Sequence, residues 1–142
     1  MIESATEQDL PEVRALLHRL SLPLDEVDDH VQTMLVARED GHVVGTAALE
    51  LYSDGALLRS VAVDPSWQGR RLGHDLTEAA LRLAAEQRVG AVFLLTTTAE
   101  RFFPKFGFQS VTRAEVPPSV QASVEFRSAC PASAIVMRKH PV

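Results

Sequence analysis

Apolar and polar positions follow two periods along the chain, and these predict strands and helices in a mixed order. Apolar residues recur at helical spacing from Leu10 to Leu20 and from Leu72 to Leu83, which predicts two amphipathic helices. Four shorter apolar runs have the length of strands, at residues 34–37, 43–49, 56–63 and 91–97. The last run is apolar almost throughout, which is typical of a strand that is buried on both faces.

Turn and cap residues mark where these elements begin and end. Asp40-Gly41 between two apolar runs is a strong hairpin signal. Thr6 and Asp9 fit the start of the first helix, and Gly90 is expected to close the second. Shorter elements are expected as strands at 1–5, 108–112 and 134–137, and as helices at 25–30, 99–106 and 119–127. This order predicts a mixed α/β fold in a single domain over residues 1–142.

Composition and charge narrow the class of protein. Of the 142 residues, 46% are hydrophobic and 23% are charged, which is typical of a globular domain. The net charge of −5 gives no general electrostatic reason to bind nucleic acid. The longest aliphatic and aromatic stretch, Ala91–Leu95, is too short to cross a bilayer, and the first residues carry no secretory-signal pattern. A single cysteine, Cys130, excludes an intrachain disulfide and a cysteine-rich zinc site, so we expect a cytoplasmic protein without a metal.

The loop before the second long helix carries the clearest functional signal. A strand that ends at Val63 leads through a proline turn and a basic, glycine-bearing loop into the helix at Leu72. The first turn of a helix has unpaired N–H groups and a partial positive charge, and glycine lets a phosphate approach the backbone. Arg70 and Arg71 add charge beside it, so an anionic phosphate ligand is predicted. A plain strand–helix joint with solvated arginines stays open as the alternative.

Two motifs resemble those of the GNAT acetyltransferases. Gln68 and Gly73 fill the first and last positions of the family's acetyl-CoA loop, Gln/Arg-x-x-Gly-x-Gly/Ala, and Arg71 stands where the middle glycine is usual. The segment 94–108 resembles the later motif, in which a buried strand precedes Phe-Tyr-x-x-x-Gly-Phe, with Phe103 in the tyrosine position. The resemblance implies the family's fold: a mostly antiparallel sheet of six to seven strands, splayed at the cofactor site, with about four helices.

The same resemblance implies acetyl-CoA as the co-substrate and a set of residues around it. Backbone N–H groups of the loop would wrap the pyrophosphate, and the backbone of Val61 and Val63 would pair with the pantetheine arm like an added strand. The implied cofactor-binding residues are Val61, Ala62, Val63, Gln68, Gly69, Arg70, Arg71, Leu72, Gly73, His74, Thr97, Phe103 and Phe106. Many members are dimers through their C-terminal strands, so a homodimer is expected from the resemblance.

Acetyl transfer also needs groups that move protons. Because Phe103 replaces the usual tyrosine, Tyr52 or Ser60 is the candidate that protonates the departing thiolate, with Thr96 or a water as alternatives. Glu50 is the candidate base, although an ordinary solvent-facing strand residue is the simpler interpretation. His30 is a candidate for contact with the substrate or for the base, against a plain loop histidine.

Three further residues bear on the acceptor. Arg59 is the candidate for binding an acceptor carboxylate, with an exposed edge arginine as the alternative and Arg127 as a second candidate. Thr96 could bind the acceptor or pantetheine, while Thr98 could cap the next helix. An α-amine, with a pKa near 8, costs roughly 3 kcal/mol less to deprotonate than a lysine near 10.4, which favours an α-amine in a site without a strong base.

The tail from Val116 to Ser133 resembles a branch of the family that is linked to arsenic-resistance operons and related to amino-acid N-acetyltransferases. The resemblance therefore implies an enzyme that acetylates the amine of an amino acid or a similar small molecule, with a role in arsenic resistance. A non-catalytic CoA-binding module of the same fold and a protein acetyltransferase remain alternatives. Cys130 is interpreted as a structural residue, because a lone thiol is a poor site for trivalent arsenic.

Overall fold

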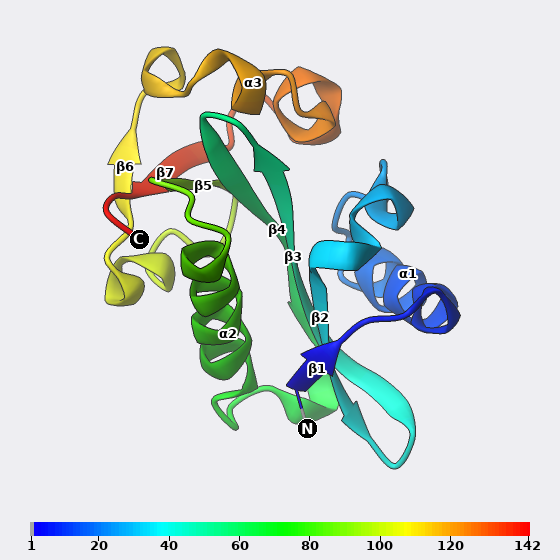
Figure 1. Cartoon of the computed structure of the whole chain (residues 1–142). Coiled ribbons are helices and arrows are strands. Elements are labelled where there is room, and N and C mark those ends of the chain that lie inside the picture. The colour runs from blue at the N-terminus through cyan, green and yellow to red at the C-terminus, as the bar shows by residue number, and fades with distance from the viewer. Residues whose placement is uncertain (1) are drawn as a thin grey trace.

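Seven strands form one sheet in the order β1-β2-β3-β4-β5-β7-β6 (Figure 1). The computed structural model describes residues 2–142, apart from the side chains at positions 128 and 129. The strands are β1 (Ile2–Ser4), β2 (Met34–Glu39), β3 (His42–Tyr52), β4 (Gly55–Val63), β5 (Val92–Thr96), β6 (Gln109–Val111) and β7 (Ile135–Lys139). All neighbouring strands are antiparallel except β4 and β5, which confirms the expected mostly antiparallel sheet.

Two long helices cover opposite faces of the sheet (Figure 1). The α-helices are α1 (Leu10–Arg19), α2 (Leu72–Glu86) and the short α3 (Pro118–Gln121). Short 3₁₀ segments are η1 (Glu7–Asp9), η2 (Val27–Thr33), η3 (Pro65–Trp67), η4 (Phe103–Phe106) and η5 (Arg113–Glu115), and η6 (Glu125–Ala129) is a π-helical turn. The adjacent residues Ala47 and Ala48 of β3 point to opposite faces, so one joins the core under α2 and the other the core under α1.

The turn chemistry explains most element boundaries. Asp40 and Gly41 both have positive φ, 53° and 79°, as a two-residue hairpin turn of type I′ requires, and the predicted hairpin is confirmed. Gly90 does not close α2, because the chain already turns at Arg88, whose φ is 60°. The predicted helix at 99–106 is reduced to η4, since Pro104 has no N–H to donate to an α-helical bond.

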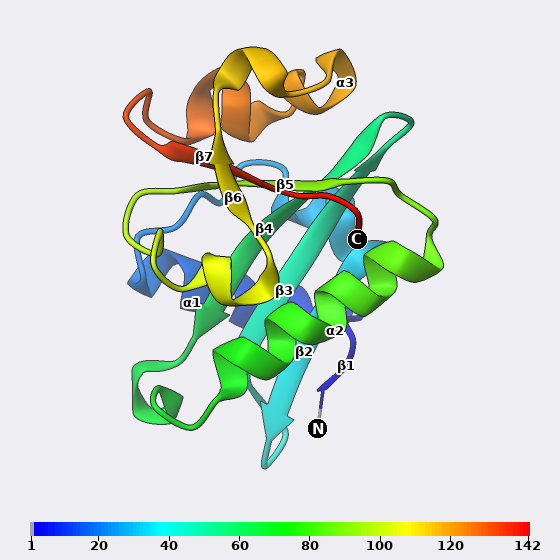
Figure 2. The same ribbon diagram turned by 90° about the vertical axis from the view of Figure 1, so that its left-hand side faces the viewer.

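The segment around α3 packs at the end of the sheet formed by the β3–β4 turn (Figure 2). The predicted helix at 119–127 is divided there into α3 and η6. Ser119 N–H donates to Asp54 in that turn, and Val120 packs against Leu57 and Phe93. This packing brings η6 over the middle of the sheet, where the candidate site lies.

The sheet opens between its two central strands. β4 and β5 pair only at Ala56 with Val92 and at Leu57 with Phe93, and beyond these pairs the strands diverge. On its other edge β4 carries a β-bulge, in which Ser60 and Val61 face a single residue of β3, and the φ of Ser60 is 57°. The predicted splay is therefore confirmed, and the bulge bends β4 at the same place.

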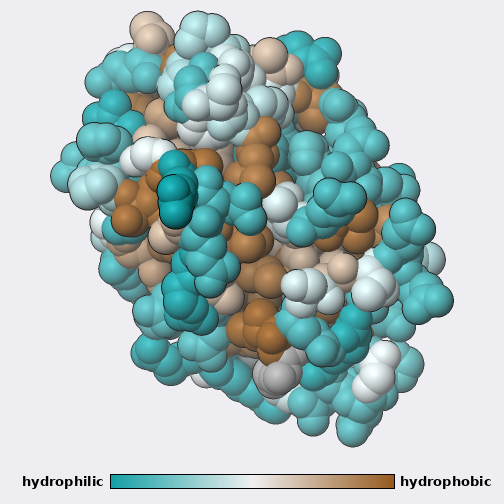
Figure 3. Space-filling view, viewed as in Figure 1, coloured by the Kyte–Doolittle hydropathy of each residue, from teal (hydrophilic) through white to brown (hydrophobic). Residues whose placement is uncertain are grey.

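The surface carries little exposed apolar area. On the face viewed in Figure 3, apolar residues are visible as a narrow central band with polar residues on both sides. Among the residues that the structure describes, Leu51 is the large apolar residue with an exposed side chain, at 37%. None of the described helices is both long enough and apolar enough to span a membrane.

Replacing Gly45 by alanine should destabilise the core between β3 and α2. A Cβ at this position would lie 2.7 Å from Leu76 Cδ1 and 3.2 Å from Leu72 Cδ2, and both leucines are buried. Overpacking of this kind costs about 1–3 kcal/mol. Denaturant unfolding should show this loss for Gly45→Ala and almost none for Gly90→Ala, where the added Cβ meets no atom within 4 Å. Equal stability of the two variants would contradict the packing described here.

Candidate active site

A cavity of about 880 Å³ occupies the gap between the diverging strands β4 and β5. The residues of β4 from Leu58 to Val63 form one wall, and the segment from Leu94 to Ala99 forms the other. The chain around Leu20–Pro23 and residues after η6 also line the cavity. The cavity therefore begins where the β4–β5 pairing stops.

The backbone of β4 turns an unpaired edge toward this cavity. Asp64 N–H donates to Val44 O on β3 at 2.8 Å. Because N–H directions alternate along a strand, the N–H group of Val63 points the other way, to the side where β5 has diverged. This is the edge on which an added strand could bind, as expected for the pantetheine arm.

The basic loop ends at the open N-terminus of α2. Asp75 N–H makes an intrahelical bond to Arg71 O at 2.9 Å, so the first-turn N–H groups that precede it have no carbonyl within the helix. Gly69 and Arg71 have φ of 83° and 63°. Arg71 thus adopts the left-handed backbone that a glycine would take more easily, and its guanidinium lies beside the His74 ring. The loop therefore makes a left-handed turn at this position with an arginine in place of the glycine.

The side chains of the loop are held by local contacts. Gln68 Nε2 donates to Val63 O at 3.2 Å, and the Arg70 guanidinium lies 4.7 Å from the centre of the Trp67 ring. His74, Asp75 and Glu78 place their ligand-type atoms within 4.8 Å of one another at the exposed start of α2. Exposed acidic groups are often close together without a metal, so this cluster does not change the cofactor expectation.

Aromatic and threonine residues form the β5 side of the cavity. Phe103 lines the cavity, is only 7% exposed and packs edge-on against Phe102, whereas Phe106 packs on His74 outside the cavity wall. Thr96 Oγ1 accepts from Ala99 N–H at 2.9 Å. Thr96 therefore caps the following turn, where Thr98 was expected to do so, because the chain turns directly at the end of β5. Thr97 lines the cavity as predicted.

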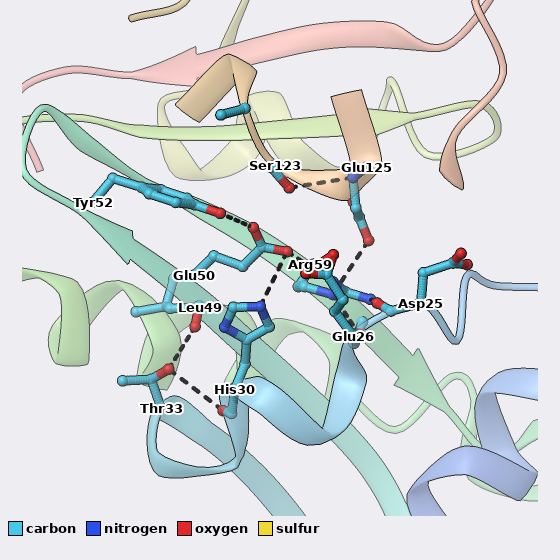
Figure 4. Close-up of polar contacts among 12 residues, drawn as sticks. Asp25, Glu26, His30, Thr33, Leu49, Glu50, Tyr52, Arg59, Ser123 and Glu125 are labelled. Carbon is cyan, nitrogen blue, oxygen red and sulfur yellow. Dashed lines mark hydrogen bonds and ion pairs between the residues drawn. The ribbon is translucent and has the colours of Figure 1, made fainter. Parts of the chain in front are cut away.

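A buried ion-pair network borders the cavity at Arg59 and Glu125, and Figure 4 shows its polar contacts. The Arg59 side chain is 0% exposed, and its guanidinium contacts Glu50 Oε2 at 2.7 Å and Glu125 Oε2 at 3.3 Å. It also donates to the backbone carbonyl of Asp25 at 2.7 Å. Arg59 is therefore neither an exposed edge arginine nor a free cation for an acceptor carboxylate, because two carboxylates of the chain already balance its charge. Arg127 pairs with Glu26 on the surface instead.

Three predicted site residues face this network and lie outside the cavity wall. Tyr52 donates its hydroxyl to Glu50 Oε1, and His30 Nε2 lies 3.5 Å from Glu50 Oε2. Burial opposes the ionisation of Glu50, but hydrogen bonds from Ser123, Tyr52 and Arg59 outweigh it and hold the pKa of Glu50 below its usual range. A carboxylate with a lowered pKa is a weak base, so the structure does not support Glu50 as the base.

The predicted roles of Tyr52 and His30 are likewise not supported by their surroundings. Burial and the neighbouring Glu50 raise the pKa of Tyr52, which keeps the phenol protonated and bound to that carboxylate. Burial lowers the pKa of His30, which favours a neutral imidazole beside Glu50. Both groups therefore support the buried pair and do not reach the acceptor. Ser60 keeps its candidacy: it lines the cavity, and its hydroxyl accepts from Arg59 Nε at 3.3 Å.

Glu125 and Cys130 join the cavity wall without having been predicted as site residues. Glu125 is only 4% exposed, and Cys130 Sγ lies 3.7 Å from Glu125 Oε1. Burial raises the pKa of Glu125 to about 7, with Arg59 opposing the rise, and burial raises the pKa of Cys130 to about 12. No spacing along the sequence connects Glu125 to Arg59, because only the packing of η6 on the sheet brings them together.

An open strand edge beside a basic helix N-terminus defines a transferase that uses an acyl-CoA, and comparisons with known proteins agree. A model described as an acetyltransferase (GNAT) domain matches residues 30–110. An amino-acid acetyltransferase of Mycobacterium tuberculosis is 32% identical over 130 residues, which cover 84% of this chain and 74% of that relative. The chain belongs to the GNAT acetyltransferase family, and it is an acetyl-CoA-dependent N-acetyltransferase.

Three further matches differ in how much of their own length this chain spans. The amino-acid acetyltransferase of Pasteurella multocida is 26% identical over 125 residues, which are 82% of this chain but only 28% of that protein. The solved structure of Rv2747 from Mycobacterium tuberculosis, a complex with CoA, has a TM-score of 0.85 and 25% identity and covers 100% of this chain and 99% of its own. The N-acetylglutamate synthase of Neisseria gonorrhoeae, complexed with coenzyme A and N-acetyl-glutamate, has a TM-score of 0.85 and 21% identity, with 100% and 35% covered.

Proposed function

We propose that the protein transfers the acetyl group of acetyl-CoA to the amine of a small molecule, an amino acid or an amino-acid-like compound. The observation that carries this proposal is the cavity of about 880 Å³ between β4 and β5, which is lined mostly by apolar side chains with a few polar groups among them. The chain around Leu20–Pro23 and the residues Cys130, Pro131 and Ala134 are part of this lining. A concave site of this kind favours a compact acceptor over a folded protein surface.

The cavity wall supports direct attack of the amine on the thioester. A backbone N–H group in the stretch Val61–Val63 would donate to the thioester carbonyl oxygen and stabilise the negative charge that develops on it. Acetyl-CoA supplies the activated acetyl group, and the first-turn N–H groups of α2 fit its pyrophosphate. Ser60 is the candidate that gives the departing sulfur a proton, since its hydroxyl lines the cavity at the bulge.

The names of relatives support the acceptor class. Several are amino-acid acetyltransferases, and the gonococcal synthase was solved with N-acetyl-glutamate. In our proposal the carboxylate of the acceptor is not held by Arg59, whose charge is already balanced within the chain. Apolar residues such as Leu22 and Pro131 line the cavity, which favours a compact acceptor with an apolar part. The role in arsenic resistance and the homodimer stay predictions from the resemblance.

A panel of amines tests this proposal directly. The protein should acetylate one or more free L-amino acids or their amides, and the release of free CoA thiol measures this reaction. Peptides and proteins with accessible N-termini should not be acetylated. Because Arg59 is not free to bind a carboxylate, an amino-acid amide should be acetylated within about tenfold of the rate of its parent amino acid. Turnover of peptides without turnover of free amines would instead assign the enzyme to protein acetylation.

A further inference from the structure

The only acidic side chain on the wall of the cavity, among the residues that the structure describes, is Glu125. It lines the cavity from η6, close to the bulge in β4. Its Oε2 lies 3.3 Å from Arg59 Nε, and the same Nε donates to Ser60 Oγ at 3.3 Å. One guanidinium nitrogen therefore lies within 3.3 Å of both the carboxylate and the hydroxyl of the bulge.

The two carboxylates of the network are held unequally. Glu50 accepts a short bond from Arg59 Nη1 and a further bond from the Tyr52 hydroxyl, so its charge is well compensated. Glu125 has the longer contact with Arg59 and a thiol neighbour, Cys130. Arg59 thus pairs with two carboxylates, and the ionised form of Glu125 is stabilised less than that of Glu50. Glu125 is consequently the carboxylate of the pair that can exchange a proton at neutral pH, which burial alone would also favour.

We propose that Glu125 is the catalytic base that takes a proton from the acceptor ammonium, and that Arg59 positions it. This inference rests on the proposed function, because it assumes that a small amine enters the cavity. Glu125 borders both the β4 bulge and the segment around Cys130. An amine that binds beside them would be close to the carboxylate and to the backbone of β4.

The protons balance as follows in the proposed reaction. The bound ammonium gives one proton to the Glu125 carboxylate, which becomes a carboxylic acid and frees the nitrogen lone pair. The nitrogen forms a bond to the thioester carbonyl carbon, and the carbon–sulfur bond breaks. The second proton of the nitrogen ends on the sulfur of CoA, with the Ser60 hydroxyl as the relay. Glu125 then returns its proton to solvent, and the products are the N-acetyl compound, CoA thiol and one proton.

The charged and titratable groups that face Glu125 determine the pH at which its carboxyl group loses its proton. Arg59 comes from β4, Glu50 from β3, Asp25 from the loop before η2, and Cys130 from the end of η6. Arg59 favours the ionised carboxylate, whereas Glu50 and Asp25 oppose it. The deprotonated, active form should therefore appear as the pH rises through about 7.

The test compares two nucleophiles in wild type and Glu125→Gln. With the L-amino acid that the wild type acetylates fastest, Glu125→Gln should lower kcat/KM about 100-fold and remove the limb that rises near pH 7. The variant's rate should then rise only as the free amine forms, at about pH 8 for an α-amine. With hydroxylamine, which is largely unprotonated at pH 7.5 and needs no base, the variant should keep its rate to within about threefold.

Controls separate this role from a structural one. Glu26→Gln removes an exposed carboxylate on the same side of the molecule and should change neither profile. Glu125→Asp should restore part of the rate together with the pH limb, and acetyl-CoA affinity should be the same in all variants. Equal losses with both nucleophiles, or a rising limb near pH 7 that persists in Glu125→Gln, would overturn the proposal. If the wild type acetylates hydroxylamine but no amino acid, the proposed acceptor fails, and the profile measured with a second simple amine still tests Glu125.

Discussion

Replacement of Arg59 by methionine is expected to lower the free energy of unfolding by about 3–5 kcal/mol at pH 8. The side chain is fully buried and contacts two carboxylates, of Glu50 and Glu125, which are themselves almost completely buried. Methionine fills a similar volume, so the loss comes from the charges that are left and not from a cavity. Two buried carboxylates without a cation destabilise the folded state, because each lost its hydration on folding and has no cation to compensate for it.

The pH dependence of the lost stability shows whether the two carboxylates left without a cation cause it. In Arg59→Met, burial without a cation raises the folded-state pKa of both carboxyl groups above their unfolded values. The folded chain then binds more protons than the unfolded chain, so its stability rises as the pH falls toward the unfolded value. Denaturant unfolding at pH 8 and pH 5.5 should therefore show a smaller difference from wild type at the lower pH.

A charge-matched variant completes this experiment. Arg59→Met combined with Glu50→Gln and Glu125→Gln removes the cation and both acids together, and it should recover at least half of the lost stability at pH 8. If Arg59→Met alone is as stable as wild type at pH 8, the guanidinium does not hold the network together.

Gly73→Asp should weaken acetyl-CoA binding about 1,000-fold without unfolding the protein. A Cβ at Gly73 meets Val63 Cγ2 at 3.6 Å and Phe102 Cζ at 3.8 Å, which are ordinary contacts. Gly73 lies in the first turn of α2, where a carboxylate is favourable for the helix. The same carboxylate would compete with the pyrophosphate for the N–H groups and repel it, and like-charge contact costs several kcal/mol.

Gly73→Asn is the matched control, because its side chain has the same size and no charge. Isothermal titration with acetyl-CoA should give a much smaller loss for asparagine than for aspartate, and the difference should decrease as salt is raised. Equal affinity of the two variants would show that charge at this position does not matter and that the pyrophosphate binds elsewhere.

The sequence predicted the elements whose causes are local. The hairpin at Asp40-Gly41, the helix from Leu72 and the basic loop before it depend on turn chemistry and periodicity over a few residues. The end of α2 was predicted at Gly90 and lies earlier, because Arg88 tolerates the left-handed turn that a glycine usually takes. Hydrophobic periodicity cannot predict the residue at which α2 ends, since this depends on how the chain enters the next strand of the sheet.

The candidate site was predictable on the cofactor side and much less so on the acceptor side. Residues 68–74 are contiguous, so their resemblance to a known loop could be seen directly. Arg59 and Glu50 were recognised as polar residues on strands, but their pairing depends on the register of β3 and β4. Glu125 depends in addition on the packing of a segment that is 66 positions further along the chain from Arg59. Partners that meet only through tertiary packing leave no pattern in one sequence.

The two residue pairs that join β4 to β5 also affect the stability of the folded state against partial opening. They are the only strand pairing, among the residues described, between the β1–β4 half of the sheet and the β5–β7–β6 half. A joint this short is a place for partial opening, in which each half stays ordered while the contact between them is lost. Acetyl-CoA bound along β4, as proposed, would contact both halves and would bind only when they are together, so saturation at a hundred times its Kd would add about 2.7 kcal/mol to the joined state. In this binding mode, cofactor supply would set the lifetime of the folded protein as well as its rate.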